Sequence, residues 1–216
     1  MDQDGSFIHV SIADIPEDQV IERLLSDPFW GTEFFHLAGM PSDMAARQNV
    51  LLHTAPGGYK GDIDVLRCNP DHPEQAVAYQ VKRIKFGISH VRNGIPSKLH
   101  EFEKVAQQAN LLNRMGFWQV YVYVVVVADT REQNLGKVTY AGVSTKLKSL
   151  VDNAMRIELL NEKIGLALLD FTQPMDHKPF TVGTHGLALR RLATPSAQTQ
   201  AITDWVAGLF ASGHET

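Results

Sequence analysis

The most constraining feature of this sequence is an almost unbroken apolar run near its middle, WQVYVYVVVVA, from Trp118 to Ala128. The run is about half as long as a membrane-spanning helix requires, and its valines and tyrosines suit a β-strand. A strand without a polar face is covered by protein on both of its faces. The run therefore predicts the central strand of an α/β sheet, in a protein that does not enter a membrane.

Helices are predicted where apolar residues recur at helical spacing between capping residues, and strands where short β-prone runs lie between turn residues. In chain order the prediction is a helix beginning at Pro16 and continuing through Leu25, a short helix Gly31–Leu37, strands Asn49–His53, Gly61–Cys68 and Ala76–Ile84, a helix Ser97–Met115 ended by Gly116, the strand Trp118–Ala128, a helix Thr145–Glu162, strands Gly165–Phe171 and Gly186–Arg190, and a last helix Ala201–Phe210.

The order of these elements indicates an α/β fold. A helix precedes a three-strand antiparallel meander, and a further helix then leads into the buried strand, which is typical of a three-layer sandwich with a central mixed sheet. The opening meander excludes a doubly wound nucleotide-binding fold. With 216 residues and no repeat or long linker, a single domain is expected, with a core at about 17–171 and a C-terminal extension at 172–216.

Composition narrows the class of protein. Hydrophobic residues make up 44% of the chain and charged residues 20%, which is ordinary for a globular protein. One cysteine, Cys68, allows no intrachain disulfide, and the acidic N-terminal segment MDQDGSFIHV does not resemble a signal peptide. A cytoplasmic protein is therefore expected. The net charge of -4 argues against nucleic-acid binding through overall charge but leaves a local basic surface open.

Two neighbouring predicted strands carry the residues that suggest chemistry. Asp62 and Asp64 in GDIDVL are two positions apart, so both carboxylates point to one face of their strand. Gln80 and Lys82 in AYQVKR share a face of the next strand in the same way. Adjacent strands can therefore bring a carboxylate, an amide oxygen and an ammonium group into one cluster.

This set of groups fits phosphodiester hydrolysis. A hard cation such as Mg²⁺ or Mn²⁺ prefers oxygen ligands and keeps some of its waters, and it can neutralise charge on phosphorus and activate a water. Asp64 is expected to be the principal ligand, with Gln80 supplying an amide oxygen, the backbone carbonyl of Val81 completing the set and Asp62 assisting. Lys82 is then suited to orient the attacking water or stabilise the transition state.

The paired motifs resemble the PD-(D/E)XK nuclease superfamily, in which a strand Asp is followed on the next strand by (Asp/Glu/Gln)-x-Lys. GDID matches at Asp64, and YQVKR matches at Gln80, Lys82 and Arg83, which is similar to the Gln-x-Lys pattern of Mrr-type restriction endonucleases. The resemblance covers roughly residues 17–171 and implies a restriction-endonuclease-like core and a metal-dependent nuclease. The Gln at position 80 departs from the commoner second carboxylate and removes one negative charge from the metal site.

The resemblance also implies residues outside the two motifs. Many family members add a helix carboxylate ahead of the meander, which here is Glu33 or alternatively Glu22. The helix after the Gln-x-Lys strand often turns polar residues toward the site, which suggests Gln107 or Lys98, with Gln108 facing solvent. A basic surface that could contact phosphates consists of Lys82, Arg83, Lys85, Arg92, Lys98 and Lys104. A solvated face remains the alternative interpretation of these charges.

The sequence therefore predicts a divalent-metal-dependent endonuclease acting on DNA in a restriction, repair or mobile-element system. Two alternatives stay open: a catalytically inactive module of the same fold that binds nucleic acid or a protein, and an interaction subunit without either activity. No helix-turn-helix or zinc module is visible, so specificity is expected from a separate subunit or is absent. Cutting both strands of DNA favours a homodimer.

Overall fold

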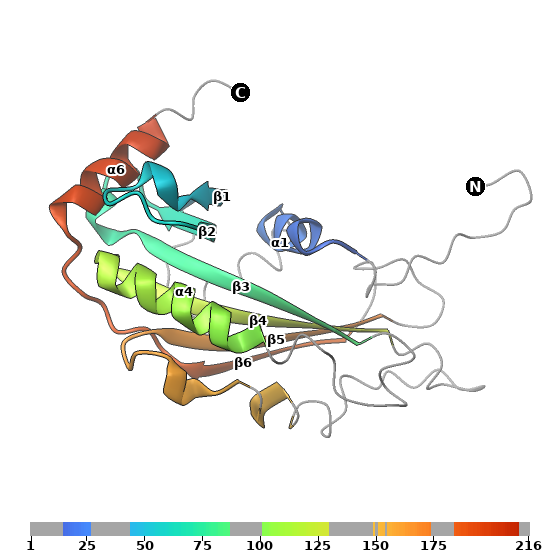
Figure 1. Cartoon of the computed structure of the whole chain (residues 1–216). Coiled ribbons are helices and arrows are strands. Elements are labelled where there is room, and N and C mark those ends of the chain that lie inside the picture. The colour runs from blue at the N-terminus through green and yellow to red at the C-terminus, as the bar shows by residue number, and fades with distance from the viewer. Residues whose placement is uncertain are drawn as a thin grey trace, which may run out of the picture.

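A computed structural model describes residues 15–26, 44–86, 101–129, 149, 151–153, 155–173 and 184–211 of the chain. These residues form one six-stranded sheet in which the strands lie in the order of the sequence (Figure 1). The strands are β1 Ala45–Leu51, β2 Asp62–Cys68, β3 Val77–Phe86, β4 Gln119–Asp129, β5 Gly165–Gln173 and β6 Thr184–Arg191. The α-helices whose bounds the structure gives are α1 Glu17–Ser26, α4 Phe102–Met115 and α6 Gln200–Ala211, and the 3-10 turns are η2 Leu52–Thr54, η3 Pro73–Gln75 and η6 Ile157–Leu159.

The sheet is mixed, as the sequence predicts. Strands β1, β2 and β3 form an antiparallel meander. Strands β3, β4 and β5 are parallel, and β6 is antiparallel to β5. The apolar run forms β4, in which residues 120–127 are all buried. The chain is therefore an α/β protein whose most apolar strand lies inside its sheet.

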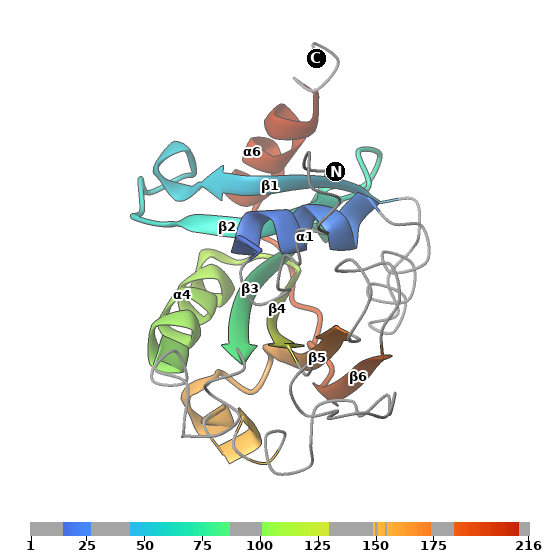
Figure 2. The ribbon, with the colours of Figure 1, turned by 90° about the vertical axis from the view of Figure 1, so that its right-hand side faces the viewer.

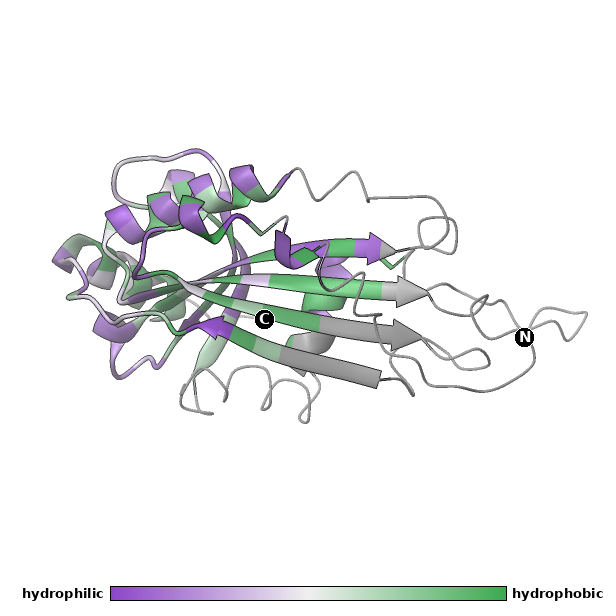
Figure 3. Ribbon diagram, turned by 90° about the horizontal axis from the view of Figure 1, so that it is seen from below, coloured by the Kyte–Doolittle hydropathy of each residue, from purple (hydrophilic) through white to green (hydrophobic). Residues whose placement is uncertain are grey.

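Helices lie on both faces of this sheet. On one face α4 packs Phe102 and Val105 into a core that includes Ala78, Ile84 and the even-numbered valines of β4. On the other face α1 packs Val20 and Ile21 against a second core. In Figure 3 the strands carry long apolar stretches, whereas polar residues recur along the helices. No helix among the described residues is both long and apolar enough to cross a membrane.

Several predicted boundaries are confirmed and others are wrong. Gly116 ends α4 in the left-handed conformation, with φ of 89°, as a C-terminal glycine is expected to do. Strand β1 begins at Ala45 rather than Asn49, and residues 52–54 form a 3-10 turn instead of continuing the strand. The predicted short helix Gly31–Leu37 and the N-cap Ser97 lie outside the described residues.

The predicted helix Thr145–Glu162 is wrong in its second half. Residues 151–153 are helical, but 157–159 form only a 3-10 turn. Asn110 of α4 explains the difference, because its Nδ2 donates to the Leu159 carbonyl at 2.7 Å and its Oδ1 accepts from the Asn161 N–H at 2.8 Å. Tertiary hydrogen bonds thus replace the helical ones in this segment.

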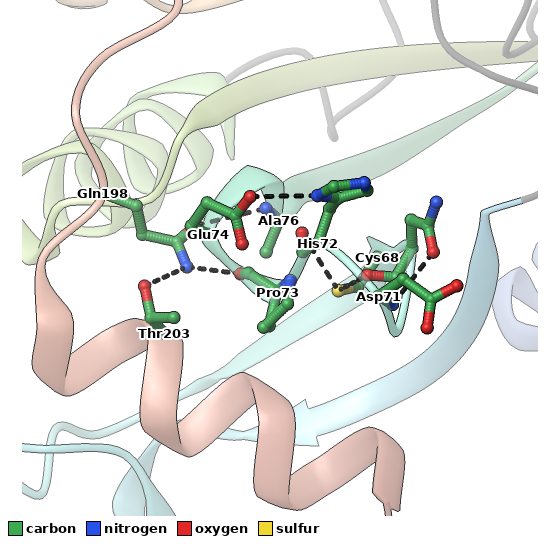
Figure 4. A network of polar contacts seen from close by, with 9 residues as sticks. Cys68, Asp71, His72, Pro73, Glu74, Ala76, Gln198 and Thr203 are labelled. Atoms are coloured by element: carbon green, nitrogen blue, oxygen red, sulfur yellow. Dashed lines mark hydrogen bonds and ion pairs between the residues drawn. The ribbon is translucent and has the colours of Figure 1, made fainter.

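A single glutamine joins the N-terminal ends of β3 and β4 to α6, and Figure 4 shows it beside Pro73, Ala76 and Thr203. Gln198 Oε1 accepts hydrogen bonds from the backbone N–H groups of Ala76 and Trp118, both at 3.2 Å. Its Nε2 donates to the Pro73 carbonyl at 2.7 Å and to Thr203 Oγ1 at 3.1 Å. One side chain therefore satisfies backbone groups from two segments that start neighbouring parallel strands.

Replacing Gln198 with alanine is expected to destabilise the fold. The change leaves two N–H groups and a carbonyl without partners, so the free energy of unfolding should fall by about 2–4 kcal/mol. Urea denaturation measures this loss. The matched control is Gln200→Ala, because Gln200 is exposed and its Nε2 contacts only Asp204 of its own helix among the described residues, at 2.7 Å. Equal effects of the two changes would contradict the role of Gln198.

Candidate functional site

The candidate site lies where β2 and β3 separate. Their ladder pairs only three residues of each strand, ending at Val65 and Tyr79, while β3 stays paired with β4 as far as Phe86. Figure 2 shows β1 and β2 running across the view while β3 turns away from them. The next pair of the ladder would be Asp64 and Gln80. The motif residues therefore mark the point at which one edge of β3 loses its neighbouring strand.

Carboxylates take over the hydrogen bonds at this free edge. Asp64 Oδ2 accepts from the Val81 N–H at 2.6 Å, and Glu17 Oε1, at the start of α1, accepts from the Arg83 N–H at 3.0 Å. Val81 and Arg83 are two positions apart, so their N–H groups point to the same edge of the strand. Buried backbone donors need acceptors, and here side chains from β2 and α1 supply them.

The amide of Gln80 bridges the same opening. Its Nε2 donates to the backbone carbonyl of Asp62 at 2.8 Å, and the residue is only 2% exposed. Because the nitrogen is held by a carbonyl of β2, the amide oxygen is the atom left to act as an acceptor or a metal ligand.

Asp64 lies in an unusual electrostatic environment. Burial raises its pKa from an ordinary 3.8 to about 7, and the hydrogen bond from Val81 opposes that rise. The negative charges of Asp62 and Glu17 raise the pKa further, and the positive charge of Lys82 lowers it. A carboxyl group strongly perturbed by burial and by like charges is frequent at functional sites.

Lys82 lies on the side of β3 that faces α4. Its Nζ is 2.6 Å from Oε2 of Glu101. Glu101 is the residue that precedes α4. The Lys82 side chain is 17% exposed and that of Glu101 is 41% exposed. The ammonium therefore sits in a sheltered position close enough to Asp64 to influence its titration.

The structure thus brings together five of the residues predicted from the motifs, namely Asp62, Asp64, Gln80, Val81 and Lys82. Among the described residues, no group of three or more His, Cys, Asp or Glu side chains is arranged to hold a metal ion. A cation here would depend on Asp64, the Gln80 amide oxygen, a backbone carbonyl such as that of Val81, and water. Such an all-oxygen set fits Mg²⁺ or Mn²⁺ better than a softer metal.

Among the described residues, the helix carboxylate that contacts β3 is not the alternative candidate Glu22. Glu22 is exposed on α1, and Glu33 lies outside the described residues. Glu17 is the α1 carboxylate that contacts β3. Glu17 lies in the first turn of α1, where a negative charge interacts favourably with the helix dipole. That local role alone accounts for an acidic residue there. That the Arg83 N–H has no neighbouring strand to accept it is a tertiary feature that no sequence pattern indicates.

Along α4 the polar residue that turns toward β2 is Gln108, not Gln107. Gln107 is exposed, whereas Gln108 is half-buried, and a Cβ added at Gly61 would lie 3.4 Å from its Nε2. Gly61 directly precedes Asp62, so Gln108 lies at the beginning of the motif strand. The prediction that Gln108 faces solvent is wrong.

The expected basic surface is only partly described. Arg83 is 8% exposed, and it alternates with Lys82, so its side chain faces the α1 side of the sheet rather than an exposed surface. Lys85 is half-buried and Lys104 is exposed. Arg92 and Lys98 lie outside the described residues. Of the described members of this set, Lys82, Lys85 and Lys104 stay candidates for contacting phosphates, and Arg83 does not.

Cys68 is buried, and its Sγ donates to the Asn69 carbonyl at 3.1 Å (Figure 4). Burial, together with the charge of Glu74, raises the pKa of the thiol to about 11. The thiol is therefore neutral at physiological pH and acts as a small core residue.

Comparison with known proteins gives no relative. The chain matches no protein-family model, no curated protein and no solved structure.

Asp64 should make the stability of the metal-free protein depend on pH. The unfolded carboxyl titrates near 3.8 and the folded one near 7, so ionisation opposes folding progressively between these values and fully above them. Asp64→Asn keeps an oxygen acceptor for the Val81 N–H but cannot ionise. In EDTA, the variant should match the wild type near pH 4 and exceed it by about 4 kcal/mol above pH 7.

Urea denaturation across this pH range measures the difference between the two proteins. Asp71→Asn provides the control, because Asp71 is exposed in the turn after β2. A difference between Asp64→Asn and wild type that stays constant from pH 4 to pH 8 would show that burial does not perturb Asp64.

Proposed function

We propose that this protein is a divalent-metal-dependent nuclease of the PD-(D/E)XK type with a restriction-endonuclease-like core, acting on DNA. The observation that supports the proposal best is the opening between β2 and β3. There Asp64 accepts the Val81 N–H and Gln80 donates to Asp62 across the gap, with Lys82 beside them. The order of helix, meander, helix and buried parallel strand agrees with this family.

The proposed mechanism assigns a role to each residue of the opening. Asp64 and the amide oxygen of Gln80 bind the cation, with the Val81 carbonyl and Asp62 as further oxygen donors. A bound Mg²⁺ or Mn²⁺ supplies charge neutralisation at phosphorus and a water of lowered pKa. Lys82 donates hydrogen bonds to the attacking water or to a non-bridging phosphate oxygen and so stabilises the negative transition state. Glu17 holds the β3 backbone and adds negative charge beside Asp64.

The proposed partner is DNA in a restriction, repair or mobile-element system. Lys82, Lys85 and Lys104 supply positive charge on β3 and α4, in a chain with a net charge of -4. Such local contacts would position the backbone of DNA without reading its sequence. A homodimer would allow both DNA strands to be cut. A separate specificity subunit would add base recognition.

A second candidate is a non-catalytic module that binds nucleic acid or a protein through the same fold. Gln80 favours it, because an amide binds a divalent cation more weakly than the carboxylate of the commoner pattern. Salt-sensitive DNA binding without metal-stimulated cleavage would select this alternative.

The proposal is tested by titrating Mn²⁺ and Mg²⁺ into wild type, Asp64→Ala and Lys82→Ala while cleavage of labelled duplex and single-stranded DNA is followed. Asp64→Ala should abolish both cleavage and the metal-dependent rise in Tm, since it removes the principal ligand. Lys82→Ala should retain the Tm shift but lose cleavage by about 100-fold or more.

Asp71→Ala and Lys163→Ala are the matched controls, because both residues are exposed and lie outside the opening. They should behave as wild type. Full metal-dependent cleavage by Lys82→Ala would contradict the role of the lysine. Wild-type protein that neither binds metal nor cleaves either substrate would contradict the proposal as a whole.

Gln80→Glu tests the amide ligand. Without metal, the variant loses the donor to the Asp62 carbonyl and adds a charge beside Asp64, so stability should fall by about 1–3 kcal/mol. With Mn²⁺ the added carboxylate should tighten binding by about tenfold, and the metal-induced rise in Tm should grow accordingly. Thermal unfolding with and without Mn²⁺ separates the two effects. An unchanged metal response would show that residue 80 is not a ligand.

A further inference from the structure

Glu101 is a carboxylate from α4 that contacts the predicted catalytic lysine. Its Oε2 lies 2.6 Å from Lys82 Nζ. Lys82 is flanked along the same face of β3 by Gln80 and by Ile84, which packs under α4. The lysine side chain is 17% exposed, so this pair is less open to water than the surface pairs Arg156–Glu158 and His72–Glu74, whose side chains are all more than half exposed. Screening by water and salt is weaker in such a position.

The backbone that carries Glu101 is firmly attached to the core. The next residue, Phe102, begins α4 and is buried, and Val105 packs one turn further along the helix. Because both residues belong to the core beneath α4, Glu101 approaches Lys82 from a fixed helix end.

A lysine at such a site needs positioning. Its ammonium lies at the end of a flexible four-carbon chain and carries three N–H donors. The contact with Glu101 uses one donor and restricts the chain, which leaves two donors for a water or a phosphate oxygen. A group held in its reactive geometry before substrate binds reacts faster than a mobile one, and displacement by about 1 Å can lower the rate by about 100-fold.

We infer that Glu101 is a positioning residue, which holds the Lys82 ammonium at the opening between β2 and β3 for phosphodiester cleavage. The inference rests on the proposed nuclease function and extends it to a residue outside both motifs. Glu101 is not assigned to the metal site or to nucleic-acid binding.

The test compares Glu101→Gln and Glu101→Asp with Glu103→Gln. Glu103 lies two positions after Glu101, in the first turn of α4, and is exposed, so its variant removes the same charge away from Lys82. Single-turnover cleavage at saturating Mn²⁺, DNA affinity and the Mn²⁺-induced shift in Tm are measured for each. Glu101→Gln should lower the cleavage rate by about tenfold or more, Glu101→Asp should recover most of it, and Glu103→Gln should match wild type.

DNA affinity and the Mn²⁺ response should stay within about twofold of wild type in all three variants, because Glu101 acts through Lys82. This split separates positioning from general destabilisation, which would alter every readout together. An unchanged cleavage rate in Glu101→Gln, with active wild type, would overturn this inference and leave the nuclease proposal intact. Equal losses in Glu101→Gln and Glu103→Gln would also overturn it, and an inactive wild type would remove both proposals.

Discussion

The free edge of β3 is the constraint on which the candidate site depends. Strand β2 pairs with β3 for only three residues, so the N–H groups of Val81 and Arg83 must find other acceptors. Asp64 and Glu17 supply them from two different elements. The same carboxylates that complete the backbone hydrogen bonds are thereby brought to one place. Fold and site thus share their interactions, and β3 can carry them because β4 holds its other edge along its whole length.

This arrangement places like charges close together in a partly buried region. Asp62 and Glu17 both raise the pKa of Asp64, and Lys82 offsets them only in part. Buried carboxylates that repel one another reduce stability unless a cation or a proton neutralises them. The sequence retains carboxylates nonetheless, although neutral amide oxygens could accept the same N–H groups with less electrostatic repulsion. Such a conflict between local stability and residue choice is expected at functional sites rather than in a core built only for packing.

Sequence patterns predicted the parts of this structure that follow from local periodicity. The unbroken apolar run identified β4 as an interior strand, and the spacing of two in Asp-x-Asp and Gln-x-Lys placed each pair on one face.

Glu17, Gln108 and Glu101 were missed because their roles depend on how α1 and α4 dock. Gln108 was within reach of sequence reasoning: it is three residues after Val105 and four before Leu112, both buried, whereas Gln107 is rotated by about 100° from it. The hydrogen-bond donor and acceptor that shorten the predicted helix 145–162 both belong to Asn110, far away in the sequence.

The charges around the opening also bear on the order in which partners could bind. Asp62, Asp64, Glu17 and Glu101 are acidic, and Lys82 already contacts one of them. Without a cation, the acidic side chains repel a phosphate more strongly than Lys82 attracts it. At neutral pH the carboxylates outnumber the lysine even with Asp64 half protonated. A divalent cation would reverse that balance by neutralising Asp64 and its neighbours and by leaving Lys82 as an added positive charge. On the proposed function, metal binding is therefore a precondition for productive contact with DNA. A net acidic chain is compatible with a nucleic-acid substrate for the same reason.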